Sequence, residues 1–164
     1  MNLQPGDLLL WRVCPSAGWI DRLVGWGESK LKQVAADGYQ YYHVATVSAD
    51  VTQMYSAQPP KTDQYPIPDP LPGNVEVWRF KGGAVQPGLG RVFAYMDSQK
   101  GLLYPIISVL SFGLLKIGRG NFCSQLAENA WLRYPYILSP DVQFTTPDLI
   151  ASSDLIERID SVPC

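Results

Sequence analysis

The chain has 164 residues, a length that suits one domain with a single core, and we expect residues 1–164 to form one domain. Hydrophobic residues make up 46% and charged residues 17%, which is a globular composition and excludes a disordered chain. Thirteen Lys and Arg residues against fifteen Asp and Glu residues leave a formal charge of −2, and no basic run occurs. We therefore expect no nucleic acid partner.

The counts of cysteine and histidine limit the chemistry. Cys14, Cys123 and Cys164 are odd in number and widely spaced, which fits neither a disulfide framework nor a zinc motif. His43 is the only histidine in the sequence. We therefore expect no metal and no cofactor, and any chemistry that needs a histidine must use His43.

The N-terminus does not resemble a targeting signal. Residues 1–6 lack the charged and then apolar run of a signal peptide, so we expect synthesis in the cytoplasm and leave the compartment open. The longest apolar stretch, Leu102–Ile117, contains Pro105 and is shorter than the ~20 residues that a membrane span requires. It is predicted to be a buried helix or loop, and we expect no membrane span.

In the first half of the chain, the pattern of apolar residues predicts a strand, a helix and a hairpin. Residues 7–13 form an apolar and aromatic run that predicts a buried strand, and helical spacing over 19–32 predicts an amphipathic helix. Strands are expected over 43–48 and 52–58, joined by a tight turn at Ala49-Asp50.

The second half begins with a segment of high proline content. Residues 59–74 contain six prolines, which excludes a ladder-forming strand or a helix and predicts an extended surface connection. Alternation over 75–80 predicts a half-buried strand. Helices are expected over 91–99, over 121–133 and from Thr146-Pro147, with a strand-like or coil segment after the last. This mixture of elements predicts the α+β class.

Cys123 is a candidate nucleophile because of its place in the helix expected to start at Asn121. It lies in the first turn, where Asn121 is expected to cap the helix and several backbone N–H groups lack internal partners. Such a position stabilises a thiolate, and the same amides can accept an oxyanion. The alternative is that Cys123 only fills the apolar face of its helix, as buried cysteines often do.

His43 is the matching candidate for a general base. If Ala49-Asp50 is a two-residue turn, His43 lies opposite Ser56, and a polar side chain facing the ring can orient an imidazole. A register shifted by one residue puts Ala57 there instead, and a shift of two puts Gln58 there. The alternative is a structural or exposed strand histidine.

Five short motifs carry a resemblance to a known family. The first half contains Pro5–Leu10 (PGDLLL), Tyr42–Val47 (YHVATV) and Met54–Ala57 (MYSA), and the second contains Gly101–Tyr104 (GLLY) and Asn121–Leu126 (NFCSQL). These motifs resemble those of NlpC/P60-type papain-like cysteine hydrolases. Because the histidine motif precedes the cysteine motif, the chain resembles the circularly permuted branch, which includes bacterial, phage, poxvirus and lecithin:retinol acyltransferase-like members.

The resemblance implies a papain-like fold, with an antiparallel sheet or small barrel packed against helices. It implies that Cys123 is the nucleophile and His43 the general base, with Ser56, or else Gln58, orienting the ring. It also places the hydroxyl of Tyr104 near the nucleophile. The family usually has His, Glu, Asn or Gln where this chain has Ser56, and an uncharged hydroxyl stabilises an imidazolium less well.

The implied activity is hydrolysis of an amide bond in a cell-wall (peptidoglycan) peptide or a related small amide. One alternative is a hydrolase or acyltransferase that acts on lipid acyl esters or amides. The other is a non-catalytic binding module that keeps the papain-like shell. The substrate is expected to be a small peptide, amide or acyl compound, and the sequence does not indicate an oligomeric state.

Overall fold

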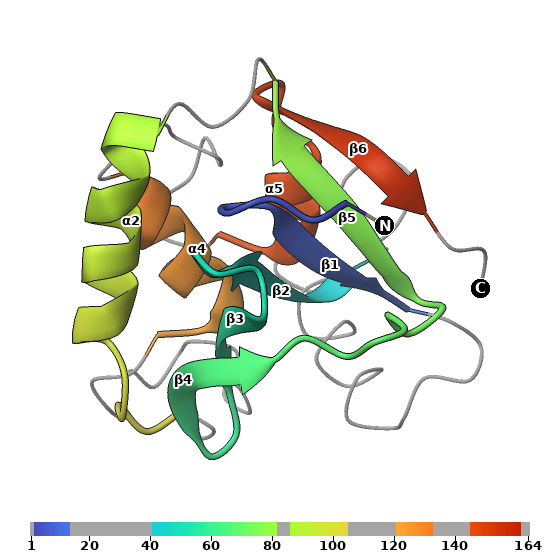
Figure 1. The fold of residues 1–164 in the computed structure, drawn as a ribbon. Coiled ribbons are helices and arrows are strands. Elements are labelled where there is room, and N and C mark those ends of the chain that lie inside the picture. Colours follow the sequence, from blue (N-terminus) through green and yellow to red (C-terminus); the bar gives the residue numbers. More distant parts are fainter. Residues whose placement is uncertain (1, 14–40, 82–85, 105–120, 133–144, 162–164) are drawn as a thin grey trace.

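The computed structural model describes residues 2–13, 41–81, 86–104, 121–132 and 145–161 (Figure 1). The described residues form six strands and three helices, which agrees with the predicted α+β class. In chain order the elements are β1 (Leu8–Arg12), β2 (Tyr41–Val47), β3 (Gln53–Gln58), β4 (Lys61–Pro66), β5 (Val75–Phe80), α2 (Gln86–Ser98), α4 (Cys123–Trp131), α5 (Pro147–Ala151) and β6 (Ile156–Ser161).

The six strands make one antiparallel sheet in the order β4-β3-β2-β1-β5-β6. The central strand β1 is the first in the chain, and it pairs with β2 on one side and β5 on the other. Leu8, Leu9 and Leu10 of β1 are all fully buried, because apolar residues cover both faces of the sheet at its centre.

The two faces carry different cores. The helices cover one face, where side chains of α2, α4 and α5 pack in one cluster with those of β1, β2, β3, β5 and β6 (Figure 1). We call this the helix-side cluster. The other face has a smaller cluster, here the open-side cluster, whose buried members all come from strands: Leu9, Ala45, Val47, Met54, Val75 and Val77.

The entry to β1 is fixed by Gly6 and Asp7. Gly6 has a positive φ of 87°, and its backbone N–H donates to the carbonyl of Val47 at 3.0 Å. Asp7 is 1% exposed and receives two hydrogen bonds from Arg79, Nε to Oδ1 at 2.7 Å and Nη2 to Oδ2 at 2.8 Å. The fork of the guanidinium therefore clamps the start of β1 to β5.

The predicted strands over 7–13 and 75–80 are confirmed, but the prediction for 59–74 is wrong in part. Residues 61–66 form β4, which pairs with β3 from Lys61↔Gln58 to Pro66↔Gln53. The ladder is compatible with the composition because Pro59 and Pro60 lie in the turn and Pro66 ends the strand.

The predicted tight turn at Ala49-Asp50 is present, since the Val51 N–H donates to the Ser48 carbonyl at 3.2 Å, but it does not join the strands as a two-residue hairpin. Strand β2 ends at Val47 and β3 begins at Gln53, with Thr46 paired to Tyr55 and Val47 to Met54. The longer loop is held by the Ser48 hydroxyl, which donates to Asp50 Oδ1 at 2.6 Å. The register is therefore shifted by two residues from the expected one.

The helix predicted over 91–99 begins earlier, at Gln86, and ends at Ser98. The helix predicted to start at Thr146-Pro147 is confirmed, since the Thr146 hydroxyl accepts from Leu149 N–H at 3.2 Å and caps α5. The helix predicted over 19–32 lies outside the described residues, as does most of the apolar stretch 102–117.

Candidate functional site

The structure brings His43 and Ser56 together. His43 lies on β2 and Ser56 on β3, and the imidazole Nε2 is 2.8 Å from the Ser56 hydroxyl oxygen. Ser56 is fully buried, so its hydroxyl is a fixed partner for the ring. With Nε2–H donating to Ser56, the ring's Nδ1 is left as the basic nitrogen.

The contact between His43 and Ser56 forms although the register between β2 and β3 differs from the predicted one. Among the described residues, the ladder between β2 and β3 comprises Thr46↔Tyr55 and Val47↔Met54. Continuing that register would set His43 opposite Gln58 and Ser56 opposite Ala45. The imidazole instead reaches diagonally to Ser56, so the predicted partner is correct although the predicted register is wrong.

The indole ring of Trp11 packs edge-on against the imidazole of His43. Trp11 is paired with His43 across β1 and β2, and the two ring centroids are 5.0 Å apart at an interplanar angle of 63°. Burial lowers the pKa of His43 from 6.5 to about 4, because desolvation penalises the charged imidazolium. The imidazole is therefore neutral near pH 7 and able to accept a proton.

The lowered pKa of His43 predicts a pH-dependent stability. Between pH 6.5 and 4 the unfolded chain binds a proton at His43 that the folded chain does not, so stability falls as the pH falls through this window. We expect a loss of about 3 kcal/mol in the free energy of unfolding. Urea unfolding of the wild type and His43→Asn at several pH values measures it. Equal slopes for the two proteins would contradict the prediction.

Cys123 is the first residue of α4, as predicted, and its side chain belongs to the helix-side cluster with 7% exposure. Helix α4 packs against both β2 and β3, the strands that carry His43 and Ser56. Val44 and Ala57, which directly follow those two residues, are members of the same cluster as Cys123, so strand alternation turns the side chains of His43 and Ser56 to the other face of the sheet, where Trp11 packs. The predicted contact between Cys123 and the His43 ring itself stays a prediction.

The predicted cap of this helix is wrong. Phe122 is the N-cap residue, and Asn121 instead donates through Nδ2 to Gln99 Oε1 at 2.9 Å. The cap residue makes no side-chain hydrogen bond to the first-turn amides. Its own backbone N–H donates to Gln125 Oε1 at 3.3 Å. Phe122 therefore supplies no capping side chain to the positive end of the α4 dipole next to Cys123.

The two remaining predicted site residues lie around the β3–β4 hairpin. Gln58 is half-buried at the end of β3 and pairs with Lys61, while the described hydrogen bond of His43 goes to Ser56. The backbone N–H of Tyr104 donates to the Pro60 carbonyl at 2.9 Å, and its side chain packs against the helix-side cluster that contains Cys123. The role of its hydroxyl stays a prediction.

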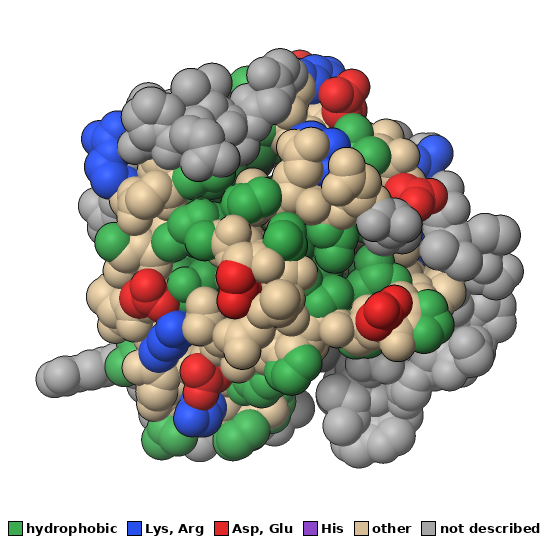
Figure 2. Space-filling model, viewed as in Figure 1, with side chains coloured by type: hydrophobic (Ala, Val, Ile, Leu, Met, Phe, Trp, Pro, Cys, Tyr) green, Lys and Arg blue, Asp and Glu red, His purple; other side chains and the backbone are tan. Residues whose placement is uncertain are grey.

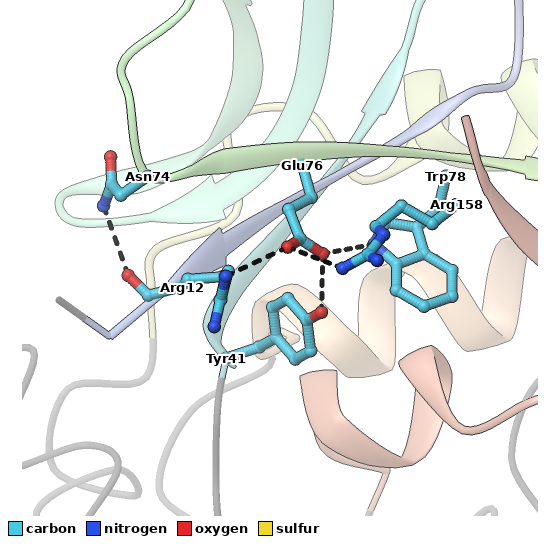
Figure 3. A network of polar contacts seen from close by, with 6 residues as sticks. All are labelled: Arg12, Tyr41, Asn74, Glu76, Trp78 and Arg158. Atoms are coloured by element: carbon cyan, nitrogen blue, oxygen red, sulfur yellow. Dashed lines mark hydrogen bonds and ion pairs between the residues drawn. The ribbon is translucent and has the colours of Figure 1, made fainter. Parts of the chain in front are cut away.

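Sequence reasoning missed a group of buried polar residues at the start of β2. The Tyr41 hydroxyl donates to Glu76 Oε2 at 2.6 Å (Figure 3). The Tyr41 N–H donates to Asp148 Oδ1 at 3.3 Å. The carboxyl groups of Glu76 and Asp148 are almost completely buried. The sequence signal for this group was Glu76, a charged residue inside the alternating segment 75–80. A buried strand position rarely carries Glu unless other polar groups pair with it.

Figure 2 shows acidic and basic side chains interspersed on the face drawn, without a continuous basic area. No helix in the described part of the chain has the length and apolar character needed to cross a membrane. Within those same residues, no cluster of three or more His, Cys, Asp and Glu side chains is arranged to hold a metal ion.

Comparison with known proteins shows the fold. No protein-family model matches the sequence, and no curated protein matches it either. The chain is similar to the crystal structure of the metalloprotein YiiX from Escherichia coli O157:H7, DUF1105, with a TM-score of 0.67 over 98% of each chain and 13% identity. The chain therefore shares an α+β fold with that protein over almost its whole length.

Proposed function

We propose that this chain is a circularly permuted papain-like cysteine hydrolase that cleaves an amide bond. The observation that carries the proposal is the partly buried hydrogen bond of 2.8 Å between His43 Nε2 and Ser56 Oγ. It lies on the two strands against which the helix of Cys123 packs. An orienting partner on one ring nitrogen leaves the other free to act as the base, which is the arrangement that thiol activation requires.

In the proposed reaction, His43 Nδ1 takes the proton of the Cys123 thiol as the sulfur attacks the carbonyl carbon of the substrate. The tetrahedral oxyanion is stabilised by the backbone N–H of Cys123 at the start of α4, assisted by the Tyr104 hydroxyl. His43 then protonates the leaving amine as the C–N bond breaks. A water molecule, deprotonated by His43, attacks the thioester, and the thiol and carboxylic acid are released.

The resting state of such a site would differ from a thiolate–imidazolium pair. Burial lowers the pKa of His43, and Ser56 carries no charge that would stabilise an imidazolium. The proton therefore stays on sulfur until substrate binds, and the ion pair is a minor species. The fraction of the site in the ion-pair form does not change with pH between the titration of His43 and that of Cys123. The neutral pair and the ion pair carry the same number of protons, so their ratio is independent of pH.

The described residues do not fit a metal centre, although the structural neighbour YiiX is described as a metalloprotein. The sequence has a single histidine, and the buried carboxyl group of Glu76 is already paired with Arg12 and Arg158. No step of the proposed reaction uses a metal.

The pH profile of Cys123 alkylation tests the proposal. With iodoacetamide and a Cys14→Ser/Cys164→Ser background, we expect a rate that falls below about pH 4, where His43 titrates, has a level region above that pH, and rises again at higher pH as the free thiolate accumulates. In His43→Ala the level region is expected to disappear, so that the rate falls tenfold per pH unit below the thiol pKa. Identical profiles for the two proteins would refute the Cys–His pairing.

Ser56→Ala and Gln58→Ala form a matched pair of controls on the same strand. Ser56→Ala is expected to lower the alkylation rate in the level region, because the His43 ring loses the hydrogen bond that orients it. Gln58→Ala is expected to leave the profile unchanged. An effect of Gln58→Ala alone would transfer the orienting role to that residue. A positive result would justify screening peptide amides and acyl esters as substrates.

A non-catalytic binding module is the second candidate function. The neutral Ser56 hydroxyl and the lowered pKa of His43 favour it, since neither supports a resting thiolate. In that case Cys123 would react as an ordinary thiol, with a rate indifferent to His43.

A further inference from the structure

We propose that Arg12 and Arg158 form a binding site for a phosphate group on the helix side of the sheet. The buried carboxylate of Glu76 holds both guanidinium groups there, each by one nitrogen. The proposal is independent of the proposed hydrolase function, because the site uses neither Cys123 nor His43.

The Glu76 carboxylate is already shared by four donors. Its side chain is fully buried, and Oε2 accepts from the Tyr41 hydroxyl at 2.6 Å and from Trp78 Nε1 at 3.2 Å. Oε1 lies 3.4 Å from Nη1 of Arg12 and 3.3 Å from Nη1 of Arg158. Two carboxylate oxygens offer about four acceptor positions, so Glu76 satisfies one nitrogen of each guanidinium and no more.

Toward the described residues, the two guanidinium groups leave most of their donors unused. A guanidinium has five N–H donors, and its planar fork favours two parallel hydrogen bonds to one oxyanion. Arg79 makes such a fork, with Nε and Nη2 at 2.7 and 2.8 Å from the Asp7 carboxylate. Arg12 and Arg158 instead make one longer contact each. Within the described part of the chain, Glu76 is the only acidic partner of either group.

Both guanidinium groups reach the surface from the buried carboxylate. The side chains of Arg12 and Arg158 are 35% and 51% exposed, against 18% for Arg79. Figure 3 shows the two groups on opposite sides of the Glu76 carboxyl group. Because both Nη1 atoms lie within 3.4 Å of the same oxygen, the two forks are close enough for one tetrahedral phosphate to contact both.

A bulge in β6 separates Arg158 from Asp160. Val77 pairs with Asp160 and the next residue, Trp78, pairs with Arg158, so Ile159 is an extra residue on β6. Regular alternation would put Arg158 and Asp160 on one face, where their charges would lie side by side. With the bulge, Asp160 lies opposite Val77 of the open-side cluster, whereas Arg158 lies opposite Trp78, which packs against the helix-side cluster. The guanidinium is therefore left for an external anion.

A bulge at Tyr42 in β2 brings the Tyr41 hydroxyl to the same carboxylate. Arg12 pairs with Tyr41, and Tyr42 is an extra residue on β2. Tyr41 therefore faces the helix side, where its hydroxyl donates to Glu76. Burial and this hydrogen bond raise the pKa of Tyr41, so the hydroxyl stays a neutral donor. The two arginines, Glu76 and Tyr41 together carry two positive charges and one negative charge, which favours an added anion.

Titration of the ¹⁵N-labelled protein with inorganic phosphate at pH 7 and constant ionic strength, followed by NMR, tests the proposal. In the wild type we expect saturable shifts of the Trp78 indole N–H and the Tyr41 backbone N–H, which lie at the site. In Arg12→Lys and Arg158→Lys we expect the dissociation constant to rise about tenfold, because lysine keeps a charge for the buried carboxylate but has no fork. Arg91→Lys, at an exposed position on α2, is the control and should leave the dissociation constant unchanged.

The outcomes separate a phosphate site from a purely structural ion pair. Absence of saturable shifts in the wild type, or the same dissociation constant in Arg12→Lys as in Arg91→Lys, would overturn the proposal. An unshifted Trp78 indole signal before phosphate is added shows that a variant keeps the arrangement around Glu76. Acetate at the same ionic strength is the second probe. Acetate binding as tight as phosphate binding would overturn the assignment to phosphate.

Vesicles identify the source of the phosphate group, which occurs both in soluble compounds and in lipid headgroups. Sedimentation of the protein with phosphatidylglycerol vesicles, weakened in Arg158→Lys and unchanged in Arg91→Lys, would assign the site to a lipid headgroup. Shifts with inorganic phosphate but no sedimentation with vesicles would assign it to a soluble phosphate compound.

Discussion

Asp7→Asn is expected to lower the free energy of unfolding by about 3–5 kcal/mol, because it leaves the Arg79 guanidinium without its carboxylate. Both nitrogens of the fork donate to Asp7 at 2.7 and 2.8 Å. Oδ2 also accepts the N–H of Gln4 at 2.8 Å, so the same carboxylate closes the turn that leads into β1. An asparagine side chain offers one acceptor oxygen and an NH₂ group that faces a donor.

Urea unfolding followed by circular dichroism measures the loss. Asp63→Asn is the matched control, since Asp63 pairs with Lys61 at 2.6 Å with both side chains partly exposed. Exposed pairs contribute about 0–1 kcal/mol, so the control should change little. Equal losses in the two variants would show that burial of Asp7 does not determine the strength of its pair.

Gly6→Ala is expected to destabilise the fold by about 2–5 kcal/mol, through strain and a clash together. The backbone of Gly6 has φ of 87°, a region that residues with a Cβ rarely adopt. A Cβ there would lie 2.9 Å from Leu89 Cδ2 and 3.2 Å from Trp131 Cη2. Trp131 is fully buried, which leaves its ring little room to move away.

Two other glycines separate the two contributions. Gly101 has φ of 82° with no atom within 4 Å of a built Cβ, so Gly101→Ala should cost only the strain, about 1–2 kcal/mol. Gly90 lies within α2 and also has open space, so Gly90→Ala should stabilise the helix by about 0.5–1 kcal/mol. Thermal unfolding of the three variants tests this order. A Gly6 loss no larger than the Gly101 loss would exclude the clash.

Elements whose pattern is local could be predicted from the sequence. Alternation in 75–80 and helical spacing after residue 121 depend on neighbours in the chain, and the structure has β5 and α4 there. The loop after β2 could not be predicted in the same way. It places Val51 at φ of 54°, which a β-branched residue seldom adopts, and this loop shifts the register by two residues.

The candidate site shows the same division. His43, Ser56 and Cys123 are identifiable because their residue types and motifs lie in short segments. The hydrogen bonds that hold Tyr41 are not identifiable, since Glu76 and Asp148 are 35 and 107 residues away from it in the sequence. Alternation indicates that His43 shares a face with Ala45 and Val47, but nothing within the segment 41–47 indicates the bulge at Tyr42 that puts Tyr41 on the other face.

The central place of β1 has a consequence for how the chain folds. Leu8 pairs with Thr46 on one side and with Trp78 on the other. Both strands that pair with β1 are therefore synthesised much later than β1 itself. Two long loops must close around one strand, and contacts of such high sequence separation slow folding. Until then, three consecutive leucines remain exposed on the nascent chain, which makes this segment prone to aggregation before the later strands are made.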